Sequence, residues 1–234
     1  MSNEPSYQVA LASNICALLY DLTSSTYDEV APKIEYWIEY VLDEQFTTIE
    51  DLVERVSVVA WDKRSSHPDI SRFLKEFRDA PHRSEPARSF VDGLCRHLLR
   101  WFAVASTEDL WTNWHMGSVS KTGGVGFIRA APFVGHLIEC GLLDRELVRR
   151  HIFKPLMSHY YNQANFSKQS IRADAIYQLF TAARNTLLQG FLEPEEVQVC
   201  FEKLETRVSL GAIAGLELFD TARLNVRCDS RLDA

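Results

Sequence analysis

Apolar residues recur every three or four positions through most of this sequence, and this spacing limits the possible folds more than any other feature. A clear run is Val197, Cys200, Phe201, Leu204 and Val208. Such spacing places apolar side chains on one face of an α-helix, whereas a half-buried strand requires strict alternation, which no segment shows convincingly. Glycine and proline, which commonly mark turns, occur only 10 and 8 times. The pattern predicts an all-α fold.

Capping residues indicate where several of the helices begin. Thr47 or Thr48, Ser84 and Asp144 can each accept a hydrogen bond from the first turn of a following helix, and Pro194 fits a first helical turn. Together with the apolar spacing, these signals predict helices over 5–21, 27–44, 48–62, 66–79, 84–105, 125–141, 144–160, 169–188, 194–208 and 210–226.

Short connections favour antiparallel packing of neighbouring helices. The clearest predicted pairs are 27–44 with 48–62, 125–141 with 144–160, and 169–188 with 194–208. Repeated helix pairs of about 40 residues are typical of a HEAT-type α-solenoid, and we expect about five pairs. The long loop 106–125 divides the chain into halves with too few pairs to stand alone. We therefore predict one domain over 1–234, with a tail beyond about residue 227.

Charge and cysteine content restrict the class of protein. Lys and Arg number 25 and Asp and Glu number 32, and the resulting net charge of −7 argues against a protein that coats nucleic acid by charge alone. Five scattered cysteines without a CxxC pair fit a reducing compartment. The apolar runs are shorter than the ~20 residues that cross a bilayer. We expect a cytoplasmic or nuclear protein that does not contact membranes.

The sequence carries no recognisable catalytic or metal-binding motif. None of the seven histidines belongs to an HExxH or HxH pattern, and GxSxG is missing. Lys121 precedes the glycines of 123–126, whereas a phosphate-binding loop places its lysine after them. We expect no metal, no cofactor and no enzymatic activity. The alternative is an all-α enzyme, which no sequence motif supports.

Two groups of residues are candidates for binding. Arg145 and Arg149, with either Lys154 or Arg150, can form a basic stripe along one helix that meets RNA phosphates, and the alternative is a solvated helix face. Trp111 and Trp114 lie on the long loop. They are either a plug tucked under a helix or an exposed anchor for a partner.

Three stretches follow one another in a recognisable order within about residues 7–210. They are LYDLTSSTY at 19–27, TIEDLVERV at 48–56 followed by SHP at 66–68, and FVGHLIECGLL at 133–143. In order and spacing they resemble the middle domain of eukaryotic initiation factor 4 gamma. The resemblance implies a crescent of five HEAT-like helix pairs that acts as a scaffold and not as a catalyst.

The resemblance also implies partners. Domains of this family commonly bind a DEAD-box helicase, and several bind RNA, so a non-catalytic scaffold or regulator in mRNA translation or mRNA metabolism is expected. Leu22 and Tyr27 of the first stretch are the residues carried over as helicase-binding candidates. A HEAT-like protein–protein adaptor with no RNA or helicase role is the alternative. This alternative is favoured by the excess of acidic over basic residues and by Tyr20-Asp21, which stands where the family has Asn-Lys.

Individual residues of these stretches have expected structural roles. Gly135 is expected to let a neighbouring helix approach closely. Leu22 and Tyr27 are expected to bracket a turn between two helices, with Thr23 or Ser24 as the cap. The predicted buried stripe of the third stretch is Phe133, Leu137, Leu142 and Leu143.

Overall fold

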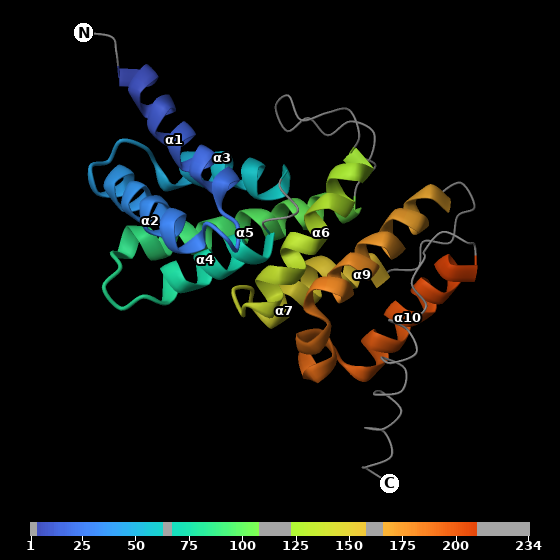
Figure 1. The fold of residues 1–234 in the computed structure, drawn as a ribbon. Helices are drawn as coiled ribbons and strands as arrows, with labels where there is room; N and C mark the ends of the chain where they lie inside the picture. Colours follow the sequence, from blue (N-terminus) through green and yellow to red (C-terminus); the bar gives the residue numbers. More distant parts are fainter. Residues whose placement is uncertain (1–3, 63–66, 108–122, 158–165, 210–234) are drawn as a thin grey trace. The chain divides into compact units, whose positions relative to one another are not determined.

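The computed structural model describes residues 4–62, 67–107, 123–157 and 166–209 (Figure 1). Within these ranges all regular structure is helical, which confirms the all-α prediction. The elements are α1 (Glu4–Asp21), α2 (Tyr27–Asp43), α3 (Ile49–Asp62), α4 (His67–Asp79), α5 (Glu85–Thr107), α6 (Gly123–Glu139), α7 (Arg145–Val148), η3 (Arg149–Phe153), α8 (Lys154–Met157), α9 (Phe166–Thr186), η5 (Leu187–Phe191) and α10 (Pro194–Ser209).

The described helices lie close to their predicted positions, with differences in form at two of them. The predicted helix 169–188 has non-helical backbone angles at Ala183 and continues into the π-helical η5. The segment predicted as a helix over 144–160 consists of α7, the π-helical η3 and α8, and it is described as far as Met157. In η3 the N–H of Lys154 donates to the carbonyl of Arg149, five residues earlier. Pro155 follows directly and has no N–H to continue the α-helical bonding pattern. The predicted helix 210–226 lies outside the described residues.

The chain divides into two compact units. The first comprises Met1–Trp101 with Cys140–Leu143, and the second comprises Phe102–Glu139 with Asp144–Ala234. The single domain over 1–234 and its solenoid arrangement stay predictions.

In the first unit, α1 packs against both α2 and α3, and α2 also contacts α4. The predicted pair of 27–44 and 48–62 thus has α1 as a common partner. Gly93 of α5 lies against α3, because a Cβ atom added to it would be 3.3 Å from Cγ2 of Val53. The largest fully buried side chains include Ile15, Leu19, Ile34, Phe73, Phe77 and Phe90. Apolar burial on this scale is the main stabilising contribution to the unit.

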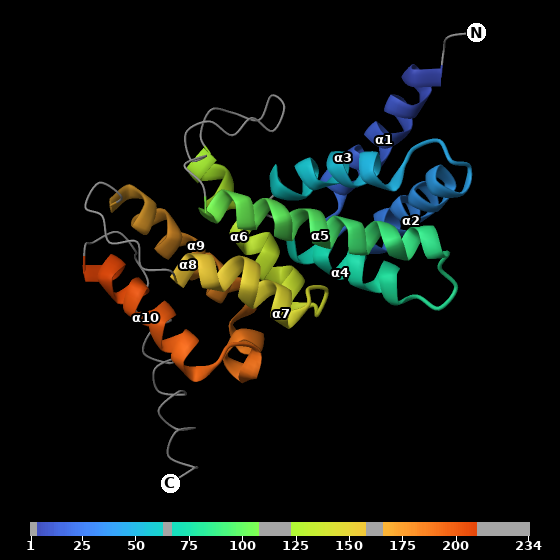
Figure 2. The same cartoon turned by 180° about the vertical axis from the view of Figure 1, so that it is seen from behind.

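In the second unit, α6 and α9 lie side by side, and α9 also packs against α10 (Figures 1 and 2). Helix α6 approaches α9 closely at Gly135, where an added Cβ would lie 2.6 Å from Cβ of Ala182 and 3.2 Å from the carbonyl oxygen of Leu179. The expected role of Gly135 is therefore confirmed. The predicted buried stripe of 133–143 is confirmed: Phe133 and Leu137 are buried in α6 of this unit, and Leu142 and Leu143 are buried in the segment that belongs to the first unit.

The predicted caps are present at three helix starts. Oγ1 of Thr48 accepts the N–H of Asp51 at 3.1 Å, and Oδ1 of Asp144 accepts the N–H of Leu147 at 2.9 Å. Oγ of Ser84 accepts from Ala87 at a longer 3.4 Å. These bonds satisfy N–H groups that have no partner inside the helix.

The cap predicted for the turn between α1 and α2 is wrong. Leu22 and Tyr27 do bracket this turn, but the residue directly before α2 is Thr26 and not Thr23 or Ser24. The Thr26 hydroxyl makes no capping bond to α2. It instead accepts the N–H of Thr23 at 3.0 Å and donates to the carbonyl of Asp21, so it stabilises the turn itself.

A residue just beyond the end of α2 has an unfavourable backbone conformation. Gln45 has φ 54°, in the left-handed region where glycine is preferred. The N–H of Phe46 donates to the carbonyl of Val41 at 3.0 Å and that of Gln45 to Leu42 at 3.2 Å. This is the Schellman arrangement, in which glycine is the usual residue at the position of Gln45.

We expect Gln45→Gly to stabilise the first unit by about 0.5–1 kcal/mol. Glutamine pays a conformational cost in the left-handed region that glycine does not, and this cost exceeds the entropy that the more flexible glycine loses on folding. Urea unfolding followed by circular dichroism measures the change. Glu44→Gly is the matched control, since Glu44 has φ −80° and ψ 0°. The control should be destabilising, and an equal effect of the two variants would contradict the assignment.

Candidate functional site

The two helicase-binding candidates are buried in the first unit. Leu22 is 0% exposed and Tyr27 is 5% exposed. The Tyr27 hydroxyl donates to Oε2 of Glu76 at 2.8 Å, and the Arg72 guanidinium lies 4.0 Å from the centre of the Tyr27 ring. Burial and, after it, the hydrogen bond to Glu76 raise the pKa of Tyr27. In this arrangement Tyr27 holds the start of α2 against α4.

The three residues of the predicted basic stripe differ in their surroundings. Nη2 of Arg145 lies 3.0 Å from Oε1 of Glu193, and Nε of Arg149 lies 2.9 Å from Oε2 of Glu196. The hydrogen bonding with Glu196 raises the pKa of Arg149. Lys154 is exposed. Two of the three positive charges are thus balanced by carboxylates of the same unit.

Arg145 has a second structural contact. Its Nε donates to the carbonyl of Phe191 at 2.8 Å, at the last residue of η5. Gln189 and Gly190 have non-helical backbone angles, so the Phe191 carbonyl lies beyond the regular part of the helix, and Arg145 supplies it with a hydrogen-bond donor. The arginines of the predicted stripe therefore join α7 and η3 to the start of α10. The tryptophans Trp111 and Trp114 lie outside the described residues.

Sequence reasoning missed a group of aromatic side chains at the end of α2, which we name the aromatic surface: Tyr36, Trp37, Tyr40 and Phe46. Tyr36 stacks on Tyr40 with ring centres 5.9 Å apart and planes inclined by 8°. Trp37 meets both rings edge-on, at 5.5 and 5.8 Å. Tyr40 also contacts Phe46 at 5.5 Å. Tyr36 is 60% exposed, an unusual degree for a large aromatic residue.

The aromatic surface could have been recognised from residue spacing. The buried residues of α2 are Tyr27, Val30, Ala31, Ile34, Ile38, Val41 and Leu42. Tyr36 and Tyr40 lie four residues apart and off this buried stripe, so they share a different face of the helix. Aromatic residues outside the core stripe are the signal that was overlooked.

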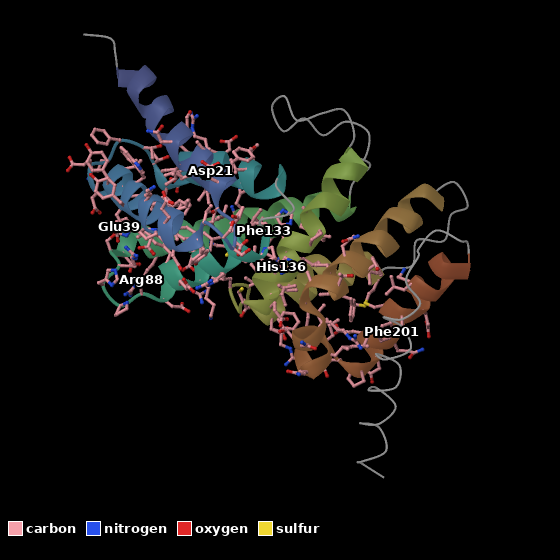
Figure 3. The ribbon with its side chains drawn as sticks, in the orientation of Figure 1. Asp21, Glu39, Arg88, Phe133, His136 and Phe201 are labelled. Atoms are coloured by element: carbon pink, nitrogen blue, oxygen red, sulfur yellow. The ribbon has the colours of Figure 1, made fainter. Side chains whose placement is uncertain are left out.

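Acidic residues surround the aromatic surface in the sequence. Between residues 27 and 56 there are only two bases, Lys33 and Arg55, against nine carboxylates. The carboxylates are Asp28, Glu29, Glu35, Glu39, Asp43, Glu44, Glu50, Asp51 and Glu54. The net charge of this segment is −7, equal to that of the whole chain. This segment therefore carries an excess of carboxylates, of which Glu35 and Glu39 pair with Arg83 from outside it; Glu39 is labelled on α2 in Figure 3.

Burial shifts the pKa of several titratable side chains elsewhere in the described residues. Burial raises the pKa of the Cys95 and Cys200 thiols to about 12, so both are poor nucleophiles at neutral pH. Burial lowers the pKa of His97 and of His136, which Figure 3 labels on α6. In the described ranges, no three His, Cys, Asp or Glu side chains come together as metal ligands.

Among the described residues, no helix combines the length and the apolar character needed to cross a membrane. Comparison of the chain with protein-family models, curated proteins and solved structures finds no match.

Proposed function

We propose that the protein is a non-catalytic scaffold that binds another protein through the aromatic surface. It would belong with the scaffolds and regulators of mRNA translation or mRNA metabolism that its sequence resembles. The observation that carries the proposal is the exposure of Tyr36, stacked on Tyr40 and edge-on to Trp37. Clustered, partly exposed aromatic residues supply large contact area at protein interfaces and are enriched among the residues that dominate binding energy.

The surroundings of the other candidates support a protein partner at this surface. Leu22 and Tyr27 are buried, so a partner would reach them only by disturbing α1, α2 and α4. Arg145 and Arg149 are paired with glutamates, which weakens the attraction that this helix can exert on phosphates. The DEAD-box helicase implied by the resemblance remains the partner to test, with the aromatic surface as its contact.

The test is a titration of the labelled chain with the DEAD-box helicase of translation initiation, at low and moderate salt. Tyr36→Ala is expected to weaken binding by about tenfold, as for a central interface aromatic. The matched control is Tyr20→Ala, which removes a tyrosine that is 38% exposed on α1, outside the aromatic surface. If the helicase does not bind, or if both variants bind as the wild type does, this form of the scaffold proposal is wrong.

RNA binding is a second candidate, favoured by two cations on the helix of the predicted basic stripe. Arg150 and Lys154 are exposed, are four residues apart, and form no ion pair with other described residues. Labelled single-stranded RNA in the same titration tests this candidate. Salt-sensitive RNA binding would support this candidate if Lys154→Glu both weakens the binding and reduces its dependence on salt concentration. Both changes are expected of a variant that neutralises fewer phosphates. RNA binding unchanged by that substitution would argue against this helix.

A further inference from the structure

We propose that the aromatic surface binds an arginine-bearing segment of a partner protein. One arginine guanidinium would lie against the ring of Tyr36, and a second arginine of the same segment would pair with the carboxylates of Asp43 and Glu44, about two turns farther along the chain. This inference rests on the proposed function and narrows the partner to one that presents a cationic segment.

The electrostatics at the end of α2 favour a cation from outside the chain. The last turn of α2 contains no basic residue, and its end carries the exposed acids Asp43 and Glu44. Neither acid forms an ion pair with another described residue. The carboxyl end of a helix is already its negative end, so two further negative charges there are unfavourable. A cationic partner would relieve this repulsion.

One of these acids, Glu44, is aligned with the aromatic rings. Tyr36, Tyr40 and Glu44 are spaced four residues apart, which places them in one row along the helix. The other two nearby acids of α2, Glu35 and Glu39, are already paired with Arg83. The row of side chains therefore ends at Glu44, and no described cation balances the charges of Glu44 and its neighbour Asp43.

The first unit already contains two examples of the proposed arrangement. The Arg72 guanidinium lies 4.0 Å from the centre of the Tyr27 ring and donates to Glu76 at 2.8 Å. The Arg83 guanidinium lies 4.6 Å from the centre of the Phe77 ring and pairs with glutamates of α2. Each combines an aromatic ring, an arginine and a carboxylate.

At the aromatic surface an exposed ring and unpaired carboxylates are present about two helical turns apart, and we assign the missing arginines to the partner. Arginine is preferred to lysine, because a planar guanidinium suits both contacts: it stacks on a ring and it pairs with a carboxylate through two N–H groups. A lysine ammonium is a compact point charge, which makes fewer such contacts at once.

The experiment uses fluorescent octapeptides of alternating serine and arginine, or of alternating serine and lysine, titrated with the full chain and followed by anisotropy. We expect the arginine peptide to bind more tightly than the lysine peptide. Tyr36→Ala should weaken the arginine peptide by about three- to fivefold, whereas Tyr36→Phe, which keeps the ring, should leave binding nearly unchanged. Circular dichroism confirms that each variant is folded.

A charge-matched pair of variants separates local binding from general attraction. Glu44→Gln is expected to weaken the arginine peptide by about threefold. Glu195→Gln removes one exposed carboxylate from α10 in the second unit and should have no effect. Equal effects of these two variants, equal binding by Tyr36→Ala and the wild type, or no peptide binding at all would each overturn the inference. If helicase binding still depended on Tyr36 in those cases, the proposed function would stand without it.

Discussion

Replacing Gly135 by valine is expected to destabilise the second unit by about 3 kcal/mol, at the upper end of the usual cost of overpacking a core. An added Cβ would lie 2.6 Å from Cβ of Ala182, closer than two carbon atoms can approach without repulsion. It would also lie 3.2 Å from the backbone carbonyl of Leu179, which cannot rotate away as a side chain can. Helices α6 and α9 would have to separate, with loss of packing along their interface.

Alanine at position 135 isolates the steric effect from the change in helix propensity. Gly→Ala in a helix interior gains about 1 kcal/mol from propensity, which offsets part of an overpacking cost of about 1–3 kcal/mol. We therefore expect Gly135→Ala to cost about 1 kcal/mol. Combining it with Ala182→Gly removes the opposing methyl group. The double variant should be more stable than the sum of the single effects predicts, by about 1 kcal/mol.

Gly93→Ala on α5 is the matched control for Gly135→Ala. Its added Cβ would lie 3.3 Å from Cγ2 of Val53 and 3.6 Å from Cγ2 of Ile49, and both are side-chain methyl groups that can shift. We expect a change between zero and about 1 kcal/mol of stabilisation. Urea unfolding followed by circular dichroism measures all these variants. Wild-type stability in Gly135→Val, or additive behaviour of Gly135→Ala with Ala182→Gly, would contradict the close approach.

The helices and the role of Gly135 could be predicted because their signals are local. Apolar spacing along 125–141 defines a helix with a buried face, and a glycine on that face marks a place where another helix comes near. The spacing does not say which helix that is. The sequence predicted pairing with the following helix, whereas α9 is the partner at Gly135. Partner choice depends on the shapes of whole faces, which residue spacing does not encode.

The candidate site was less predictable for a related reason. Arg149 looks like part of a basic stripe in the sequence, yet its partner Glu196 is 47 residues away, and no spacing rule links the two. Tyr27 looks like a surface motif residue, but its ring is buried and its hydroxyl binds Glu76 on α4. Tyr36 and Tyr40, in contrast, could have been found from their position off the buried stripe.

Replacing Arg83 by methionine is expected to destabilise the first unit by about 2–3 kcal/mol. The Arg83 side chain is 5% exposed, and it pairs through Nη2 with Glu35 and through Nη1, at 2.9 Å, with Glu39. Its guanidinium also covers the ring of Phe77 at 4.6 Å. Removing one partner of a buried pair costs about 3–5 kcal/mol, and we reduce this figure because the glutamates are 27% and 29% exposed.

Methionine is chosen because it keeps an apolar stem that can still lie against Phe77, so that the loss reports mainly on the charge. Arg83→Lys should fall between the wild type and Arg83→Met, since it keeps the charge but loses the two-pronged geometry. Arg96→Met is the control, because Arg96 is an exposed arginine of α5 in the same unit. Its substitution should change the free energy of unfolding by less than about 0.5 kcal/mol.

The decisive variant combines Arg83→Met with Glu35→Gln and Glu39→Gln. In Arg83→Met the two carboxylates stay four residues apart on α2 with no cation between them, and their repulsion adds to the cost. Neutralising both should therefore recover part of the lost stability, although the same glutamine substitutions in the wild type should be destabilising. This reversal of sign would show that Arg83 stabilises the unit through its ion pairs with Glu35 and Glu39. If the glutamines were equally destabilising in both backgrounds, Arg83 would stabilise the unit only by its packing on Phe77.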